Sequence, residues 1–149
     1  MKTIFRLISI CFLITISMYS YSQKGLGKQT GISHEINKTS VFNLNGELLE
    51  IKIGPCEYTS GRYEFGTHLI LRNSKDDSRI NIHLGPTQEV QYVVDQLTIG
   101  NELKVKAFRT SEMPEDNYIA QEIIYDRKVI TLRDKNLRPF WAGKGWRFK

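Results

Sequence analysis

The stretch HLGPTQEVQYVVDQL, residues 83–97, decides the fold class. It begins as the end of a strand, breaks at Gly85-Pro86 and continues as a short helix, because Pro suits the first helical position. Four aliphatic residues then recur at helical spacing and form one apolar stripe: Val90, Val93, Val94 and Leu97. A single helix between the third and fourth strands of a small β domain predicts a five-stranded OB-like Greek-key barrel. In that fold Val90, Val94 and Leu97 would close the bottom of the barrel.

Alternating apolar residues predict the strands, at 41–53, 66–72, 79–84, 102–110 and 118–125, with a further short strand at 129–133. The predicted barrel domain therefore covers 41–143. Gly46 lies inside the first run, and a glycine within a strand often marks a bulge or a sharp bend. Such a bend would let the first strand pair with two neighbours.

The polar turn at 73–78 joins the second and third strands into a hairpin, and the apolar pattern sets its register. Five aliphatic side chains of this hairpin must share the core face: Leu69, Leu71, Ile80, Ile82 and Leu84. Paired residue numbers in an antiparallel ladder have a constant sum, so Leu71 opposite Ile80 places His68 opposite His83. Both histidines would lie on the outward face. A one-residue slip would turn one apolar set outward, whereas two-residue slips stay open.

Two facing imidazoles can ligate a metal ion, form a pH-sensitive pair or be an ordinary polar cross-strand pair. The ordinary pair is favoured, because the sequence identifies no third ligand beside His68 and His83. The loop between strands one and two flanks the ligand face in an OB-fold. The predicted ligand-binding face therefore comprises Tyr58, Arg62, Tyr63, His68, Arg72, Arg79 and His83.

The first 22 residues have the layout of a secretory signal peptide. A basic segment (1–6) precedes an apolar run (7–18), and Ser20 and Ser22 provide small residues for cleavage before Gln23. The run is too short for a comfortable membrane span, although an uncleaved anchor is the alternative. We therefore expect an exported protein, periplasmic or secreted, with a flexible leader at 23–40. Loss of Lys2 and Arg6 would leave 19 basic and 16 acidic residues, a formal charge of +3.

Export would also leave one cysteine, Cys56, which cannot form an internal disulfide and is expected to be a small buried apolar residue. The chain ends in a basic aromatic segment. Residues 127–149 include eight basic residues and one acidic residue, Asp134. The tail at 144–149 could contact an anionic membrane surface peripherally. The alternative is that Phe140 and Trp141 pack on the barrel while the last residues fray, and this is favoured for Trp141.

Two stretches, IHLGP (82–86) and LRDKNLRPFWAG (132–143), resemble a small exported bacterial domain. It occurs in magnetosome proteins of the MamS/MamX type and in many periplasmic proteins. The resemblance covers roughly 41–143 and implies an OB-like barrel in the periplasm or at a membrane, without implying a reaction. The family usually carries Gly where this chain has Leu137. Some relatives bind heme through a CxxCH motif, which is absent here, so no cofactor is expected.

Several chemistries are disfavoured by missing motifs. The chain has no G-x-S-x-G elbow, no glycine-rich phosphate loop before a helix and no basic residue beside Cys56. Nucleic acid would suit an OB-fold with exposed arginines and tyrosines, but an exported protein rarely meets it. The sequence therefore predicts an exported, non-enzymatic OB-fold binding module for an unknown protein or small ligand. The alternatives are a metal or redox accessory domain of the envelope and, more weakly, a hydrolase that uses Cys56.

Overall fold

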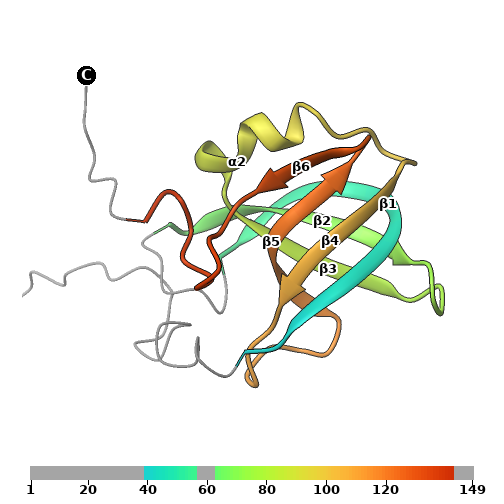
Figure 1. Cartoon of the computed structure of the whole chain (residues 1–149), viewed down its shortest axis with the longest axis horizontal. Helices are drawn as coiled ribbons and strands as arrows, with labels where there is room; N and C mark the ends of the chain where they lie inside the picture. The colour runs from blue at the N-terminus through green and yellow to red at the C-terminus, as the bar shows by residue number, and fades with distance from the viewer. Residues whose placement is uncertain (1–38, 57–62, 143–149) are drawn as a thin grey trace, which may run out of the picture.

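A computed structural model of the chain describes residues 39–56 and 63–142. This part of the chain forms six strands and one helix: β1 (Val41–Pro55), β2 (Phe65–Asn73), β3 (Arg79–Pro86), α2 (Thr87–Val94), β4 (Glu102–Phe108), β5 (Asn117–Tyr125) and β6 (Lys128–Thr131). All six strands belong to one sheet in the order β3-β2-β1-β4-β5-β6 (Figure 1). The mainly-β prediction is confirmed. The sheet has six strands rather than five because the short segment after β5 pairs with it as β6.

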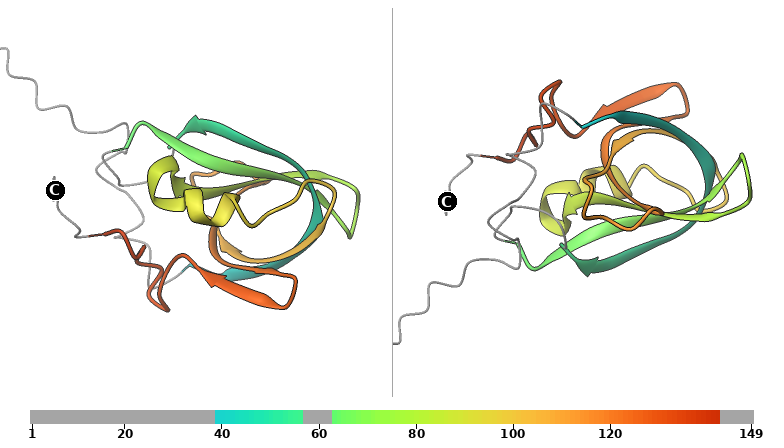
Figure 2. Two further views of the ribbon diagram at one scale, coloured as in Figure 1. Left: turned by 90° about the horizontal axis from the view of Figure 1, so that it is seen from above. Right: turned by 90° about the horizontal axis from the view of Figure 1, so that it is seen from below.

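β1 connects the two halves of the sheet. Its second half pairs antiparallel with β2 and its first half with β4, and Gly46 and Glu47 take part in both ladders. β3 also pairs with β5, in parallel, through residues 81–83 and 117–119. The pairings among β1, β2, β3, β5 and β4 therefore return to β1. Figure 2 shows how strongly β1 bends to reach both neighbours.

Of the bulge or sharp bend that the sequence predicts at Gly46, the structure has the bend, because Gly46 lies where β1 pairs with both β2 and β4, whereas the bulge lies elsewhere. The register of the β1–β2 ladder shifts between Leu48 and Glu50, a few residues farther along the strand. Glycine at 46 has a different cause, because a Cβ there would collide with the backbone carbonyl group of Arg72 on β2. The close approach of β2 to the bent part of β1 requires a residue without a side chain.

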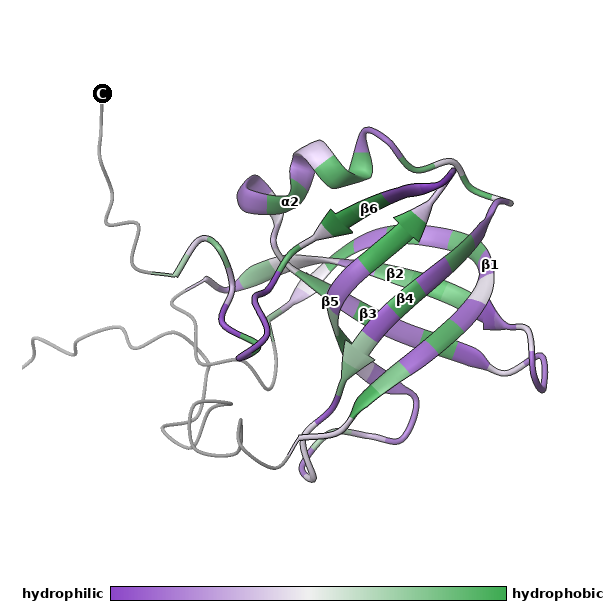
Figure 3. Cartoon of the chain, in the orientation of Figure 1, coloured by the Kyte–Doolittle hydropathy of each residue, from purple (hydrophilic) through white to green (hydrophobic). Residues whose placement is uncertain are grey.

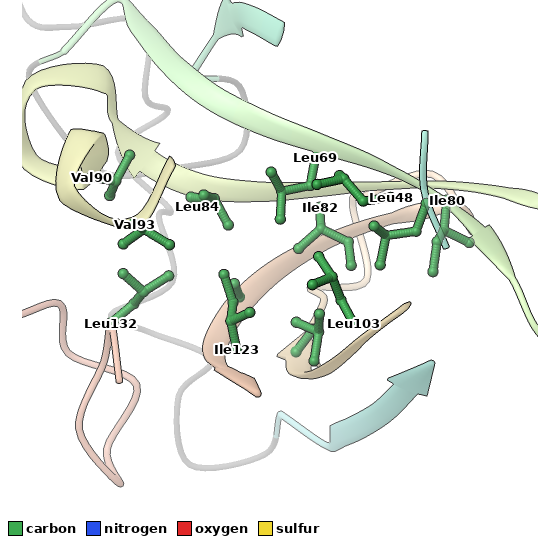
Figure 4. Packing of buried hydrophobic residues seen from close by; sticks show 14 residues of the cluster. Leu48, Leu69, Ile80, Ile82, Leu84, Val90, Val93, Leu103, Ile123 and Leu132 are labelled. Carbon is green, nitrogen blue, oxygen red and sulfur yellow. The ribbon is translucent and has the colours of Figure 1, made fainter. Parts of the chain in front are cut away.

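The core lies on the inner face of the curved sheet. Apolar and polar residues alternate along the strands (Figure 3), as expected when one face of each strand is buried. The five hairpin residues predicted for the core face, including Leu69 and Ile82, are all buried in one cluster. Val90 and Val93 of α2 lie with Leu84 and Leu132 at one end of this cluster (Figure 4). Burial of such aliphatic side chains stabilises the fold by about 1.5–3 kcal/mol each.

Helix α2 begins one residue later than predicted, with Pro86 as its N-cap residue and Thr87 as its first helical residue. Its buried face passes through Val90 and Val93, which are three residues apart. The prediction of a buried Val94 is wrong, because Val94 lies beside this face and is half-exposed. Leu97, beyond the end of the helix, packs against the core and is only partly buried.

The segment after β6 folds back toward β3 and β5 through a buried arginine. The Nη1 atom of Arg133 donates a hydrogen bond to the carbonyl oxygen of Leu84 (2.9 Å) and to that of Ala120. Its guanidinium carbon lies 5.1 Å from the ring centre of Trp141 and 5.9 Å from that of Phe108. Burial lowers the pKa of Arg133 to about 9, so the group stays charged at neutral pH. Carbonyl oxygens and aromatic faces thus replace the water that the cation loses.

The segments 82–86 and 132–142 touch each other in the fold. Besides the bond from Arg133 to Leu84, the ring of Trp141 lies where a Cβ of Gly85 would be. The prediction that Trp141 packs on the sheet is confirmed, whereas Phe140 remains mostly exposed and the same prediction for it is wrong. The signal peptide (1–22), almost all of the leader (23–40) and the tail (144–149) lie outside the described residues.

Candidate binding site on the outer face of β1, β2 and β3

A pocket of about 260 Å³ opens on the face of β1–β3 that points away from the core. The ladders place Lys52 beside His68 and His68 beside His83, so these three side chains form one row across the strands. The pocket is lined by the last residues of β1, by β2 and β3, and by the segment around the start of β5: Lys52, Ile53, Gly54, Pro55, His68, Asn81, His83, Met113, Asn117 and Tyr118.

The predicted register of the two histidines is confirmed. His68 pairs with His83, Leu69 with Ile82 and Leu71 with Ile80. The ring centres of the two imidazoles lie 4.7 Å apart with their planes tilted by 57°, and the Nδ1 atom of His83 lies 3.3 Å from the Nε2 atom of His68. The strands therefore bring together two ring nitrogens rather than two stacked ring faces.

The outward face is less open than the sequence suggests, since His68 and His83 are only 8% and 5% exposed. A second apolar cluster, Phe108, Met113, Ile119 and Leu137, forms from β4, β5 and the segments that follow them. Met113 of this cluster borders the pocket, as does the end of β1. Gly66 makes room for the imidazole, because a Cβ there would collide with the ring of His83 and lie 2.8 Å from the sulfur of Cys56.

Hydrogen-bonding atoms surround His68, and positive charge adjoins His83. The Nδ1 atom of His68 lies 3.0 Å from the Oδ1 atom of Asn81, and its Nε2 atom lies 3.1 Å from the carbonyl oxygen of Pro55. Burial, followed by the charges of His68 and Arg133, holds the pKa of His83 well below its usual value. His83 is therefore a neutral imidazole at pH 7, with one ring nitrogen free of a proton.

Three of the other predicted ligand residues, Tyr63, Arg72 and Arg79, do not line this pocket. Arg72 and Arg79 form exposed ion pairs with Glu47 (3.4 Å) and Glu50 (3.9 Å). The hydroxyl of Tyr63 donates a hydrogen bond to Glu89 of α2 over 3.3 Å; burial, more than this carboxylate, raises the pKa of Tyr63. Tyr58 and Arg62 lie outside the described residues. Of the five residues of the predicted ligand face that the structure describes, only His68 and His83 line the pocket.

Sequence reasoning missed several residues that line the pocket. Asn81 could have been found, because it has the same strand parity as His83 and hence lies on the same face. Asn117 and Tyr118 reach the site through the parallel pairing of β3 with β5. The sequence contains no local signal for that pairing, because the two strands are separated by α2 and β4.

Cys56 is buried, as predicted, and burial raises its pKa to about 11. Its thiol thus keeps its proton at neutral pH, which disfavours nucleophilic catalysis by this residue. Within residues 39–56 and 63–142, no three His, Cys, Asp or Glu side chains gather as metal ligands.

None of the helices in the described part of the chain is long and apolar enough to span a membrane. Neither a scan of protein-family models nor a search of curated proteins returned a match to this chain.

Proposed function

We propose that this chain is an exported, non-enzymatic binding module built on an OB-like Greek-key barrel. The circuit of pairings β1-β2-β3-β5-β4-β1, with a helix between β3 and β4, supports the barrel. The observation that carries the function is the pocket on β1–β3, bordered by Met113 of the β4–β5 connection. OB-folds hold their ligands on this face, so the assignment of the pocket rests on analogy of fold.

The pocket combines an apolar wall with polar groups. Ile53 is 65% exposed there, and Met113 and Tyr118 extend the apolar surface. Asn81 and Asn117 provide amides, and Lys52 adds the positive charge of an exposed side chain. This chemistry suits a small ligand, or a short segment of a partner protein, that carries an apolar part and an acidic or hydrogen-bond-accepting group.

Two observations disfavour the competing functions. The exposed arginines of the β2–β3 hairpin form ion pairs with glutamates, so fewer of their hydrogen-bond donors are available to bind the phosphates of a nucleic acid. The buried, protonated Cys56 is a poor nucleophile for a hydrolase. An activity screen that compares the wild type with Cys56→Ala tests the hydrolase directly.

Binding can be tested by following the backbone amide signals of the isotope-labelled protein during titration with fractions of envelope extract. We expect shifts confined to the pocket, at residues 52–55, 81–83 and 113–118. Lys52→Glu should reduce them, whereas Lys104→Glu, an exposed lysine on β4, should not. Shifts that avoid the pocket, or that respond equally to both substitutions, would refute this site.

The proposal of export rests on the sequence of residues 1–22 and on the resemblance to envelope domains. N-terminal sequencing of protein from the native host should find Gln23 first. Recovery of cytoplasmic protein that retains Met1 would contradict export and would reopen nucleic-acid binding. Peripheral membrane contact through 144–149 is tested by comparing sedimentation of the chain with anionic and neutral vesicles.

A further inference from the structure

The facing nitrogens of His68 and His83 have the spacing of two ligands on one metal ion. They lie 3.3 Å apart, a distance at which one imidazole can also donate a hydrogen bond to the other. An ion about 2.05 Å from each nitrogen would see them at an angle of about 107°, since half of 3.3 Å divided by about 2.05 Å is the sine of half that angle. This is close to the tetrahedral angle.

Hydrogen bonding around His68 points the same way. Both of its ring nitrogens face oxygen atoms, Oδ1 of Asn81 at 3.0 Å and the carbonyl oxygen of Pro55 at 3.1 Å. A neutral imidazole has a single N–H and cannot donate to both. If Nδ1 donates to Asn81, the lone pair of Nε2 faces the lone pairs of Pro55, and a cation between them removes the repulsion. A doubly protonated His68, or an Asn81 amide turned by half a turn, are the competing arrangements.

We propose that Nε2 of His68, Nδ1 of His83 and the carbonyl oxygen of Pro55 bind a first-row divalent transition-metal ion. Zn²⁺ fits best, because it prefers tetrahedral coordination by imidazole nitrogen and oxygen. The fourth position would face the pocket. This inference goes beyond the proposed binding function, because it depends on these three atoms and not on any organic ligand or partner.

The surroundings fit this role with one opposing effect. Asn81 supplies the acceptor that orients the other nitrogen of His68, as partners of metal-binding histidines usually do. Against the site act the positive charges of Lys52 and Arg133, and no acidic residue of the described ranges 39–56 and 63–142 lines the pocket. We therefore expect weaker binding than at structural zinc sites with thiolate ligands.

The test is calorimetric titration of the metal-free full chain with Zn²⁺, together with long-range ¹H–¹⁵N spectra of its histidines. We expect one bound ion per chain, with Nε2 of His68 and Nδ1 of His83 shifting to metal-bound values. His68→Ala and His83→Ala should abolish binding, and the matched His34→Ala should leave it unchanged. Asn81→Leu should weaken it about 10–100-fold, whereas Asn81→Asp, which keeps the acceptor, should not.

The two histidines are buried, so their alanine variants are interpreted only if their circular dichroism and unfolding midpoint show a native fold. If either variant unfolds, the spectra of the wild type decide, because they identify the ring nitrogens that bind the zinc ion. The proposal is overturned if the wild type binds no zinc in the millimolar range, if His83→Ala binds as tightly as the wild type, or if the shifts fall on other nitrogens.

Discussion

Leu137 is buried and has a strained backbone. At this position a glycine variant should therefore be more stable than an alanine variant, which is the opposite of the usual order. Its φ of 60° lies in the left-handed region, yet the residue is only 5% exposed and packs in the cluster with Phe108 and Met113. The turn around it is held by Asp134, whose Oδ1 atom accepts hydrogen bonds from the backbone N–H groups of Asn136 and Arg138. The chain therefore cannot relax this conformation without breaking the turn.

Leu137→Ala removes the buried side chain and keeps the strain, which costs about 2–5 kcal/mol. Leu137→Gly removes the same side chain and also relieves the left-handed strain of about 1–2 kcal/mol. The greater freedom of glycine in the unfolded chain takes back about 0.5–1 kcal/mol. The glycine variant should therefore be destabilised relative to the wild type, but it should be more stable than the alanine variant by about 1 kcal/mol.

Urea unfolding followed by tryptophan fluorescence measures this difference. With a denaturant dependence of about 1–3 kcal/mol per molar urea, 1 kcal/mol moves the midpoint by about 0.3–1 M. The same two substitutions at Leu103, which is fully buried in the regular strand β4, are the control, and there glycine should be the less stable. If Leu137→Gly unfolds at the same urea concentration as Leu137→Ala or a lower one, the left-handed conformation carries no strain and the reasoning fails.

Three further predictions use other parts of the fold. Val93→Ala should lower the free energy of unfolding in urea by about 2 kcal/mol, and Val94→Ala should lower it by less than half of that. The reason is that Val93 is fully buried whereas Val94 is not. Equal losses of stability would contradict the observed buried face of α2. Arg127→Gly should raise the free energy of unfolding by about 1 kcal/mol, because Asp126 and Arg127 form a two-residue hairpin turn in which both residues have left-handed φ angles, 47° and 63°. An unchanged midpoint in urea unfolding would argue against this turn type. The sequence has one other cysteine, Cys11, and in a Cys11→Ser chain iodoacetamide reports on Cys56 alone. At pH 8 it should alkylate Cys56 about 100-fold more slowly in the folded than in the unfolded protein, because a pKa of about 11 instead of 9.0 reduces the fraction of thiolate. Similar rates would show an accessible thiol.

The register of the hairpin was predictable up to slips by two residues. A one-residue slip of β3 against β2 would expose a row of aliphatic side chains such as Leu69 and Ile82, whereas a two-residue slip would keep them buried. The observed pairing of His68 with His83 is the register in which Leu71 lies opposite Ile80. The strands and the position of the helix were predictable for the same reason, because their apolar period is strong and local.

The burial of the histidine pair was not predictable from alternation. The alternation of side chains along β3 shows that His83 points away from the core, but it does not show whether another part of the chain covers that face. Here the cover comes from distant segments, through the parallel pairing of β3 with β5 and the second apolar cluster around Phe108. The same long-range contacts bring Met113 and Asn117 to the pocket, whereas Arg72 and Arg79, on the same hairpin, remain in exposed ion pairs.

The contact between Arg133 and Leu84 belongs to one buried junction, where Arg133 binds two carbonyl oxygens and Trp141 covers Gly85. A buried guanidinium left without these partners would be costly, so each residue of the junction is constrained by the others. None of these four residues lines the pocket. The junction therefore determines how the chain closes over β3, and the chemistry of the pocket has to be inferred from His68, His83 and their neighbours.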